Sequence, residues 1–266
     1  MPRAISDNWN QGSPYERYVG RWSRAVAAHF VKALSIPPGR RWLDVGCGTG
    51  ALCAAIVDSC APASVTGVDP SEGFLATARE HLGDRVALRQ GNATSIPLDD
   101  ASVDVVVSGL VINFVPDPAA ALREMKRVAS RGGTIAAYVW DYAGRMELMR
   151  HFWDAAVALD PAAAPLDEGD RFPLCRPQAL EALLAGAGLT GVAAHPIDIP
   201  TRFVDFDDYW QPFLGGQGPA PAYVSTLDDE GRARLRERLR ARVPASKDGS
   251  IDLVARAWAV RGDVAA

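Results

Sequence analysis

Three glycines at alternate positions stand between a strand-like run and a helix-like run, and this arrangement restricts the fold more than any other feature of the chain. Residues 42–45 are apolar except for one aspartate, Gly46, Gly48 and Gly50 follow, and residues 51–56 repeat apolar side chains at helical spacing. The pattern predicts a strand, a tight turn and a helix. Because glycine has no Cβ, backbone N–H groups of the turn can approach a ligand, and the helix start adds unpaired donors. The sequence therefore predicts a turn that holds a nucleotide-like cofactor.

The glycine spacing indicates which cofactor the turn would hold. A dinucleotide turn reads G-x-G-x-x-G, whereas the third glycine here comes one residue early. Asp44 would repel phosphates but suits an amino group or a cation; the alternative is that it only accepts from backbone N–H groups of the turn. Asp69 ends the next strand-like run, residues 64–68, where a carboxylate matches a ribose diol, and it could also cap the following helix. A ribose, an amino-bearing group and no pyrophosphate point to S-adenosylmethionine.

Three segments in order resemble the successive motifs of a known family. They are Leu43–Gly50 (LDVGCGTG), Val65–Ser71 (VTGVDPS) and Gly91–Leu98 (GNATSIPL). They are similar to the class I S-adenosylmethionine-dependent methyltransferases, and most similar to the type 11 small-molecule group that includes quinone-pathway C-methyltransferases. The resemblance covers about residues 14–141. It implies an α/β fold: a Rossmann-like, seven-stranded, mostly parallel sheet with helices on both faces, an antiparallel last strand and helical insertions that form a lid.

The resemblance also assigns cofactor contacts. In the family, an acidic residue at the position of Asn92 accepts from the adenine amino group; the asparagine carbonyl could still accept, and the N–H of Ala93 would meet a ring nitrogen. The alternative for Asn92 is a plain Gly-Asn turn. The full set expected to bind S-adenosylmethionine is Tyr18, Arg21, Trp22, Asp44, Gly46, Cys47, Gly48, Gly50, Asp69, Pro70, Asn92, Ala93, Ser108 and Gly109.

The N-terminal segment resembles the lid helix of bacterial type 11 enzymes. Tyr15, Tyr18 and Trp22 offer aromatic faces to a sulfonium, a cation–π contact of about 0.5–2 kcal/mol. Arg21 could pair with the methionine carboxylate. The alternative is an amphipathic helix that packs Trp22 into the core.

Alternating elements predict a parallel sheet with right-handed crossovers. Strands are expected at 41–46, 64–69, 86–90, 103–109, 133–141, 190–203 and 250–261, and helices at 14–35, 50–60, 71–82, 117–129 and 177–187. We expect one domain over residues 1–266, with a lid helix at 1–36, a cofactor-binding core at 37–141, and helical substrate-lid insertions at 142–175 and 204–248. Within the fourth strand, Asp104 is expected to be structural.

Three residues are candidates for catalysis. His151 falls in the first insertion and is the best-placed histidine for proton transfer, although a lone histidine is usually not catalytic. Asn113 follows the fourth strand, where many relatives carry histidine; it can orient a substrate but cannot take a proton, and it could simply terminate the strand. Tyr138 ends the fifth strand and would line the substrate mouth. The sequence leaves O-, N- and C-methylation open.

Charge and composition restrict the kinds of partner that we expect the chain to bind. The 266 residues carry a net charge of −4, which argues against broad nucleic-acid binding. The four cysteines have no C-x-x-C spacing, so neither a metal site nor a disulfide framework is expected. The N-terminus lacks the pattern of a signal peptide, and the longest apolar run, 105–115, is too short to span a bilayer. A cytoplasmic protein without a membrane partner is expected.

Other functions remain open. A non-catalytic S-adenosylmethionine-binding sensor or subunit fits the same turn, while the glycine spacing speaks against a nicotinamide-dependent oxidoreductase. The hypothesis of an RNA or protein substrate would depend on the arginine-rich stretch 232–242. The apolar stripe of this stretch is more typical of a solvated lid helix. The expected partner is a small-molecule methyl acceptor, and the oligomeric state, monomer or homodimer, is left open.

Overall fold

The computed structural model describes residues 21–215 and 218–266, without the side chain of residue 21. The contacts predicted for Tyr15 and Tyr18 lie outside these residues. The described chain divides into two compact units. The core unit comprises residues 23–140, 174–197 and 257–266, and the insertion unit comprises the described parts of 1–22, 141–173 and 198–256. Both predicted insertions, 142–175 and 204–248, fall almost entirely within the insertion unit.

Seven strands form one sheet in the order β3-β2-β1-β4-β5-β7-β6. They are β1 (Arg41–Val45), β2 (Ser64–Asp69), β3 (Ala87–Gln90), β4 (Val103–Gly109), β5 (Ala129–Trp140), β6 (Thr190–Phe203) and β7 (Ile251–Asp263). β1 to β5 run parallel to their neighbours, and β7 runs antiparallel to β5. The predicted mostly parallel, seven-stranded sheet with an antiparallel last strand is confirmed.

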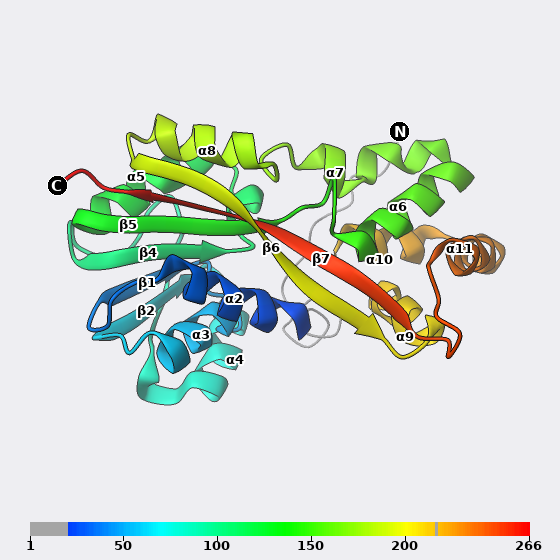
Figure 1. Cartoon of the computed structure of the whole chain (residues 1–266), viewed down its shortest axis with the longest axis horizontal. Coiled ribbons are helices and arrows are strands. Elements are labelled where there is room, and N and C mark those ends of the chain that lie inside the picture. The colour runs from blue at the N-terminus through cyan, green and yellow to red at the C-terminus, as the bar shows by residue number, and fades with distance from the viewer. Residues whose placement is uncertain (1–20, 216–217) are drawn as a thin grey trace. The chain divides into compact units, whose positions relative to one another are not determined.

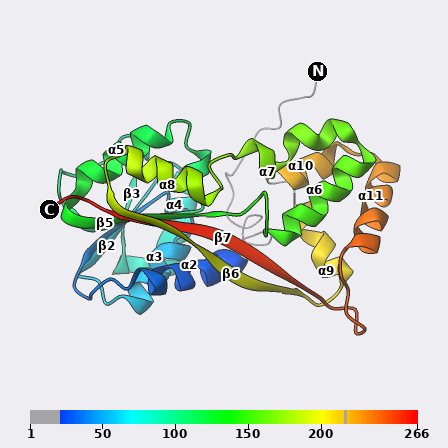
Figure 2. The same ribbon diagram turned by 45° about the horizontal axis from the view of Figure 1, so that its top comes forward.

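Helices cover both faces of this sheet, as predicted. In the core unit, α2 (Arg21–Leu34) and α3 (Ala51–Ser59) lie on one face, while α5 (Pro118–Val128) and α8 (Pro177–Gly186) lie on the other (Figures 1 and 2). The helix α4 (Glu72–Leu82) follows β2. Burial on both faces explains why the strands read as nearly continuous apolar runs: four of the five residues of β1 and five of the seven of β4 are buried.

The fifth strand begins earlier than expected, because the predicted turn lies inside it. Val103 pairs with Ala129, and Val105 already pairs with Thr134, so several residues of β5 bulge out of the ladder. Gly132 takes a left-handed φ of +67°, and a Cβ on Gly133 would lie 2.8 Å from two backbone carbonyl oxygens. The glycine pair therefore allows the bulge rather than ending the strand.

Asp104 joins the amino-terminal ends of β1 and β4. Its Oδ2 accepts from the backbone N–H of Arg41 at 2.9 Å, and its Oδ1 accepts from the Arg41 guanidinium at 2.7 Å. The Ser130 hydroxyl lies 3.4 Å from the same Oδ1. The structural role predicted for this carboxylate is confirmed, and it accounts for a charged residue within an apolar strand.

The outer strand β6 offers few donors to another chain. It carries Pro196 and Pro200, which have no N–H, and the Ala194 N–H donates to the Glu181 carboxylate at 2.9 Å. Proline within a sheet is confined to edges and bulges, and such features protect an open edge from pairing with a second copy.

The insertion unit has its own aromatic core. Its helical elements are α6 (Glu147–Leu159), η4 (Pro161–Leu166), α7 (Glu168–Arg171), α9 (Phe206–Trp210), η5 (Gln211–Leu214), α10 (Pro219–Thr226) and α11 (Asp229–Arg242). Phe152 stacks on Phe213 at 4.5 Å between ring centroids. Tyr209 links this pair to Phe203 at the end of β6, and because such rings bury large apolar areas, they give the inserted segments a core of their own.

The arginine-rich helix is α11, and much of its charge is used within the insertion unit. Leu235 and Leu239 are buried as predicted, and the guanidinium of Arg240 lies 4.5 Å from the centre of the Phe206 ring. Arg242 forms an ion pair with Asp154. These contacts favour the packed, partly solvated helix over an anion-binding surface.

Replacing Asp104 by alanine should lower the free energy of unfolding by about 1–2 kcal/mol at pH 7, since three N–H donors of Arg41 lose their acceptor. The Arg41 guanidinium lowers the pKa of Asp104 from 3.8 to about 2. A lowered pKa stabilises the fold above about pH 4, and this contribution is lost as the pH falls toward 2. Urea denaturation at pH 7 and pH 3 measures both effects.

The matched control is Asp58→Ala, because Asp58 pairs with Arg85 while its side chain is 64% exposed. An exposed pair of this kind should contribute about 0.5 kcal/mol or less. Equal losses in the two variants would contradict the role given to Asp104.

Candidate functional site

The glycine turn between β1 and α3 has the backbone conformation that its sequence predicts. Gly46, Gly48 and Gly50 have φ values of +78°, +53° and +90°. A Cβ on Gly46 would lie 2.5 Å from the Val111 side chain, whereas a Cβ on Gly48 would meet no atom within 4 Å. Gly46 is therefore required by packing, and Gly48 leaves its backbone open to a ligand. No side chain caps the start of α3.

Asp69 connects the glycine turn to the second strand. Its Oδ2 accepts from the Gly48 N–H at 2.9 Å, and its Oδ1 accepts from the Ser71 N–H at 2.8 Å. Burial raises its pKa, and these two N–H donors oppose that rise. The N-cap of α4 is Ser71, which accepts from the Phe74 N–H at 3.3 Å. Since each carboxylate oxygen can accept more than one hydrogen bond, Asp69 retains capacity for a ribose diol.

Asp44 is enclosed within the sheet. It is 1% exposed and lies between Gly67 of β2 and Val107 of β4. Its Oδ2 accepts from the Cys53 thiol at 3.2 Å, while its Oδ1 is buried without a partner. Burial raises the pKa of Asp44 to about 7. An orphaned buried acceptor at the carboxyl end of a strand is suited to a ligand's donor group.

The corner after β3 lies next to Asp69, since Asp69 and Gln90 are register partners. The Asn92 Oδ1 accepts from the Thr94 N–H at 3.0 Å and from its hydroxyl at 3.1 Å. This is the side-chain turn that Asn readily forms. A contact from this carbonyl to adenine would have to replace one of the two bonds, so the N–H of Ala93 is the more available group. Both contacts stay predictions.

Comparison with known proteins agrees with this geometry. Residues 43–137 match the family model described as a methyltransferase domain. A demethylmenaquinone methyltransferase of Staphylococcus aureus is 37% identical over 117 residues, which cover 43% of this chain and 47% of that protein. Residues 43–137 of this chain are thus similar to a methyltransferase domain. The chain matches about half the length of this relative, and the residues that match the family model lie within the predicted cofactor-binding core, 37–141.

Solved structures of similar proteins share the fold at low sequence identity. A phosphoethanolamine N-methyltransferase of Haemonchus contortus, crystallised with S-adenosyl-L-methionine, has a TM-score of 0.61 and 14% sequence identity. The alignment covers 100% of this chain and 62% of that protein's chain. A protein of Bacillus halodurans has a TM-score of 0.60 and 16% identity over 91% of this chain and 100% of its own. These likenesses establish the methyltransferase fold.

The methyltransferase sheet places further candidates at the carboxyl ends of β4 and β5. The Ser108 hydroxyl donates to the Val45 carbonyl at 2.9 Å, so it joins two strands. A Cβ on Gly109 would lie 2.5 Å from the Tyr138 hydroxyl, and Tyr138 itself is 2% exposed. The Nδ2 of Asn113 is buried without a partner. Asn113 comes two residues after Val111, which packs on the glycine turn, so an unused amide donor lies close to the cofactor corner.

The two cofactor-binding candidates at the start of α2 are Arg21 and Trp22, and the structure describes the side chain of Trp22 only. Trp22 is 5% exposed and packs edge-on against Phe203 at 5.4 Å within the insertion unit. This agrees with the packing alternative for Trp22, and its contact with the sulfonium stays a prediction. Arg21 is the first residue of α2, and its pairing with a carboxylate also stays a prediction.

His151 belongs to α6 of the insertion unit, whereas the glycine turn and Asp69 belong to the core unit. Its Nδ1 is buried without a partner. Burial lowers the pKa of His151, and the charge of Arg242 lowers it further. The imidazole is therefore kept neutral near pH 7, as a general base requires, and its catalytic role stays a prediction.

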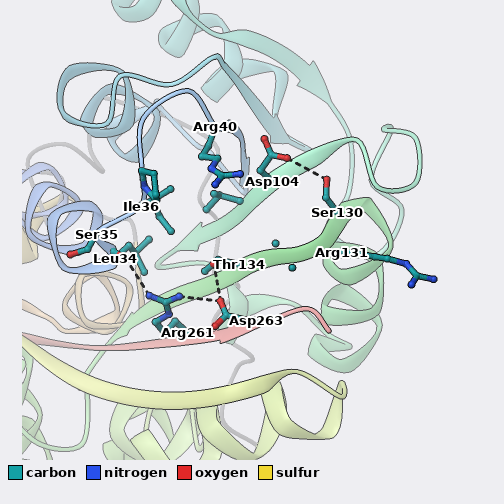
Figure 3. A pocket seen from close by; sticks show the side chains of 14 residues that line it. Leu34, Ser35, Ile36, Arg40, Asp104, Ser130, Arg131, Thr134, Arg261 and Asp263 are labelled. Atoms are coloured by element: carbon teal, nitrogen blue, oxygen red, sulfur yellow. Dashed lines mark hydrogen bonds and ion pairs between the residues drawn. The ribbon is translucent and has the colours of Figure 1, made fainter. Parts of the chain in front are cut away.

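A cavity of about 320 Å³ opens at the opposite, amino-terminal edge of the core sheet (Figure 3). Its charged groups largely satisfy one another: Asp263 accepts from Arg261 at 3.0 Å and from the Thr134 hydroxyl at 2.8 Å. Among the described residues of the predicted cofactor set, none lines this cavity. The chemistry is thus expected at the other edge of the sheet.

Two features are absent from residues 21–215 and 218–266. No group of three or more His, Cys, Asp or Glu side chains could hold a metal ion there. No helix in that part of the chain is long and apolar enough to cross a bilayer.

Glu168, at the start of α7, is a buried carboxyl group that no sequence motif indicates. It is 2% exposed, and its Oε2 accepts from the indole N–H of Trp153. Burial raises the pKa of Glu168 from 4.5 to about 7, and the nearby charge of Asp167 adds to the rise. Glu168 follows no motif, and only the helical packing of the insertion unit buries it.

The variant Glu168→Gln should become more stable relative to the natural protein as the pH rises. Because the folded pKa is raised, the carboxyl stabilises the fold fully below about pH 4.5, and this contribution is lost as the pH rises toward 7. The amide can still accept from Trp153 and carries no charge. We expect a relative gain of about 1–3 kcal/mol between pH 5 and pH 8, measured by urea unfolding followed by tryptophan fluorescence.

The control for this prediction is Glu80→Gln, an exposed residue of α4. It should respond equally at both pH values. If Glu168→Gln shows no greater pH dependence than Glu80→Gln, the carboxyl is not protonated in the fold.

Proposed function

We propose that this protein transfers the methyl group of S-adenosylmethionine to a small-molecule acceptor. The observation that carries the proposal is the pair of carboxylates at the first two βα corners. Asp69 is bonded to the glycine turn and retains acceptor capacity, while Asp44 presents a buried oxygen without a partner. Paired phosphates would be repelled by both groups, whereas a ribose and an amino group match them.

Each predicted contact follows from this arrangement. Asp69 would accept from the ribose hydroxyls, and Asp44 would accept from the amino group of the methionine part. The open backbone at Gly48 would allow close approach of the cofactor, with Cys47 in the same turn and Pro70 after Asp69 at the second corner. Arg21 would meet the methionine carboxylate.

Positioning is the main catalytic task we assign to the chain. Bound S-adenosylmethionine supplies a methyl group that is already activated as a sulfonium substituent. Alignment of the acceptor with that methyl group can lower a barrier by about 7–11 kcal/mol. The unused amide donor of Asn113 is suited to orient an acceptor oxygen or nitrogen, and Tyr138 shapes the wall beside Gly109.

A strong base is needed only when the acceptor arrives protonated. His151, with its lowered pKa, would then take the proton. This assignment rests on the family resemblance, which implies that helical insertions form a substrate lid. An acceptor that is a free amine or an enolisable carbon would not require this residue.

A small-molecule acceptor is favoured over a macromolecule. The relative from Staphylococcus aureus is named for demethylmenaquinone, and the structural neighbour from Haemonchus contortus was crystallised with phosphomonomethylethanolamine. Several arginines of α11 that would bind RNA instead form ion pairs with carboxylates, namely Arg232, Arg236, Arg240 and Arg242. All four cysteines are free thiols, as in proteins of the reducing cytoplasm, where we place the reaction.

Titration calorimetry and a turnover assay test the proposal together. We expect S-adenosylmethionine and S-adenosylhomocysteine to bind and NAD not to bind. With a labelled methyl donor and a metabolite extract, label should appear in a small molecule. Binding without any transfer would favour the non-catalytic sensor, and binding of NAD alone would refute the cofactor assignment.

The variant Gly48→Ala should lose cofactor affinity by about tenfold or more while the protein remains folded. Its left-handed φ costs a Cβ-bearing residue about 1–2 kcal/mol, and the added methyl group would occupy the open space that we assign to the cofactor. Calorimetry with S-adenosylhomocysteine and a thermal unfolding scan measure the two effects.

Gly39→Ala is a matched control, because Gly39 has a φ of +77° and also meets no atom within 4 Å of a built Cβ. It lies before β1, away from the glycine turn. Gly39→Ala should lose similar stability and keep full affinity. A similar affinity in both variants would show that the space at Gly48 holds no ligand.

A further inference from the structure

The acidic residue of the glycine turn has a neighbour that the motifs do not include. Cys53 lies in the first turn of α3, is fully buried, and its thiol donates to the Asp44 Oδ2 at 3.2 Å. The other oxygen of the same carboxyl group, Oδ1, has no partner. The thiol therefore fixes one oxygen and leaves one available.

The surroundings offer the carboxyl group few other donors, and the backbone N–H of Cys53 is one of them, since it also lowers the pKa of Asp44. Asp44 lies between Gly67 and Val107, which offer no polar side chain. Cys47 covers Gly67, since a Cβ on that glycine would lie 2.9 Å from the Cys47 Sγ. Without the Cys53 thiol, the backbone N–H of residue 53 would remain as a donor, but the orientation of the carboxyl group would be less restricted.

We propose that Cys53 is a positioning residue of the cofactor site, whose thiol orients Asp44 so that Oδ1 faces the amino group of the bound cofactor. This inference rests on the proposed function, because it takes the amino group as the ligand of Asp44. Cys53 itself touches no part of the cofactor and acts only through the carboxylate. A thiol is a weak donor, so its effect is directional and modest in size.

A pH profile separates this role from simple packing. The titratable groups that face Asp44 among the described residues are Cys53 of α3, Cys47 of the turn and Asp69 of β2. The Cys53 hydrogen bond lowers the pKa of Asp44, and the charge of Asp69 raises it. Loss of the thiol donor should therefore move the titration of Asp44, and with it the pH at which cofactor binding reaches half its maximum, to higher pH.

The test compares two ligands in three variants. S-adenosylhomocysteine carries the amino group of its amino-acid part, whereas 5′-methylthioadenosine lacks that amino group and keeps the ribose and adenine. In Cys53→Val, which keeps the volume without a donor, affinity for S-adenosylhomocysteine should fall about three- to tenfold. Affinity for 5′-methylthioadenosine should stay unchanged. Cys53→Ser should restore the affinity for S-adenosylhomocysteine. The control is Cys60→Val, at the C-cap of α3, which should change the affinity for neither ligand.

Each outcome decides a specific question. An equal loss for both ligands, or no rescue by serine, would show that Cys53 only supports the packing of the turn and would overturn the inference. Unchanged binding of S-adenosylhomocysteine in Cys53→Val would overturn it as well. If the natural protein binds neither ligand, the proposed function fails first. If Cys53→Val does not fold, Cys53→Ser alone still reports the pH at which cofactor binding reaches half its maximum. This midpoint should shift when a hydroxyl replaces the weaker thiol donor. It should stay in place if Cys53 matters only for packing.

Discussion

The hydrogen bond from the Gly48 N–H to the Asp69 carboxylate joins the first two βα corners, and the site depends on it. Gly48 belongs to the turn after β1 and Asp69 ends β2. The Gly46 N–H adds a bond of 2.7 Å to the Val68 carbonyl. These contacts fix the turn against the neighbouring strand, so its open face keeps one shape. A ligand that meets a preformed surface loses less conformational entropy on binding.

Most of the fold could be predicted because its signals are local. Parallel strands that are buried on both faces read as apolar runs, and turns between them need glycine, proline or asparagine. The expected β5 was the informative exception. Gly132 and Gly133 predict a turn, but the structure continues the strand through them by means of a bulge, where a Cβ on Gly133 would lie 2.8 Å from the carbonyl oxygens of Asp104 and Ser130. Sequence alone does not show whether a glycine pair ends a strand or bends it.

The site was predictable where a motif fixes residues close in the chain, and less so where side chains meet through packing. Gly48 and Asp69 could be named from spacing. Cys53 could not, because its contact with Asp44 depends on how α3 lies on the sheet. Glu168 is hidden for the same reason: a glutamate on a short polar segment reads as exposed, and only Trp153 and the surrounding helices bury it. Asn92 shows the reverse case, since its local turn explains the residue without a ligand.

Asp44 shows why such a site weakens the fold that carries it. A buried acceptor without a partner costs about 1–3 kcal/mol, and burial raises the pKa of this group to about 7. An apolar residue would fill the same position between Gly67 and Val107 without that penalty. The unfavourable burial is understandable if a ligand supplies the missing donor, because the same free energy then contributes to binding. Stability and affinity are linked through one oxygen atom, and any ligand that satisfies it should also stabilise the native state.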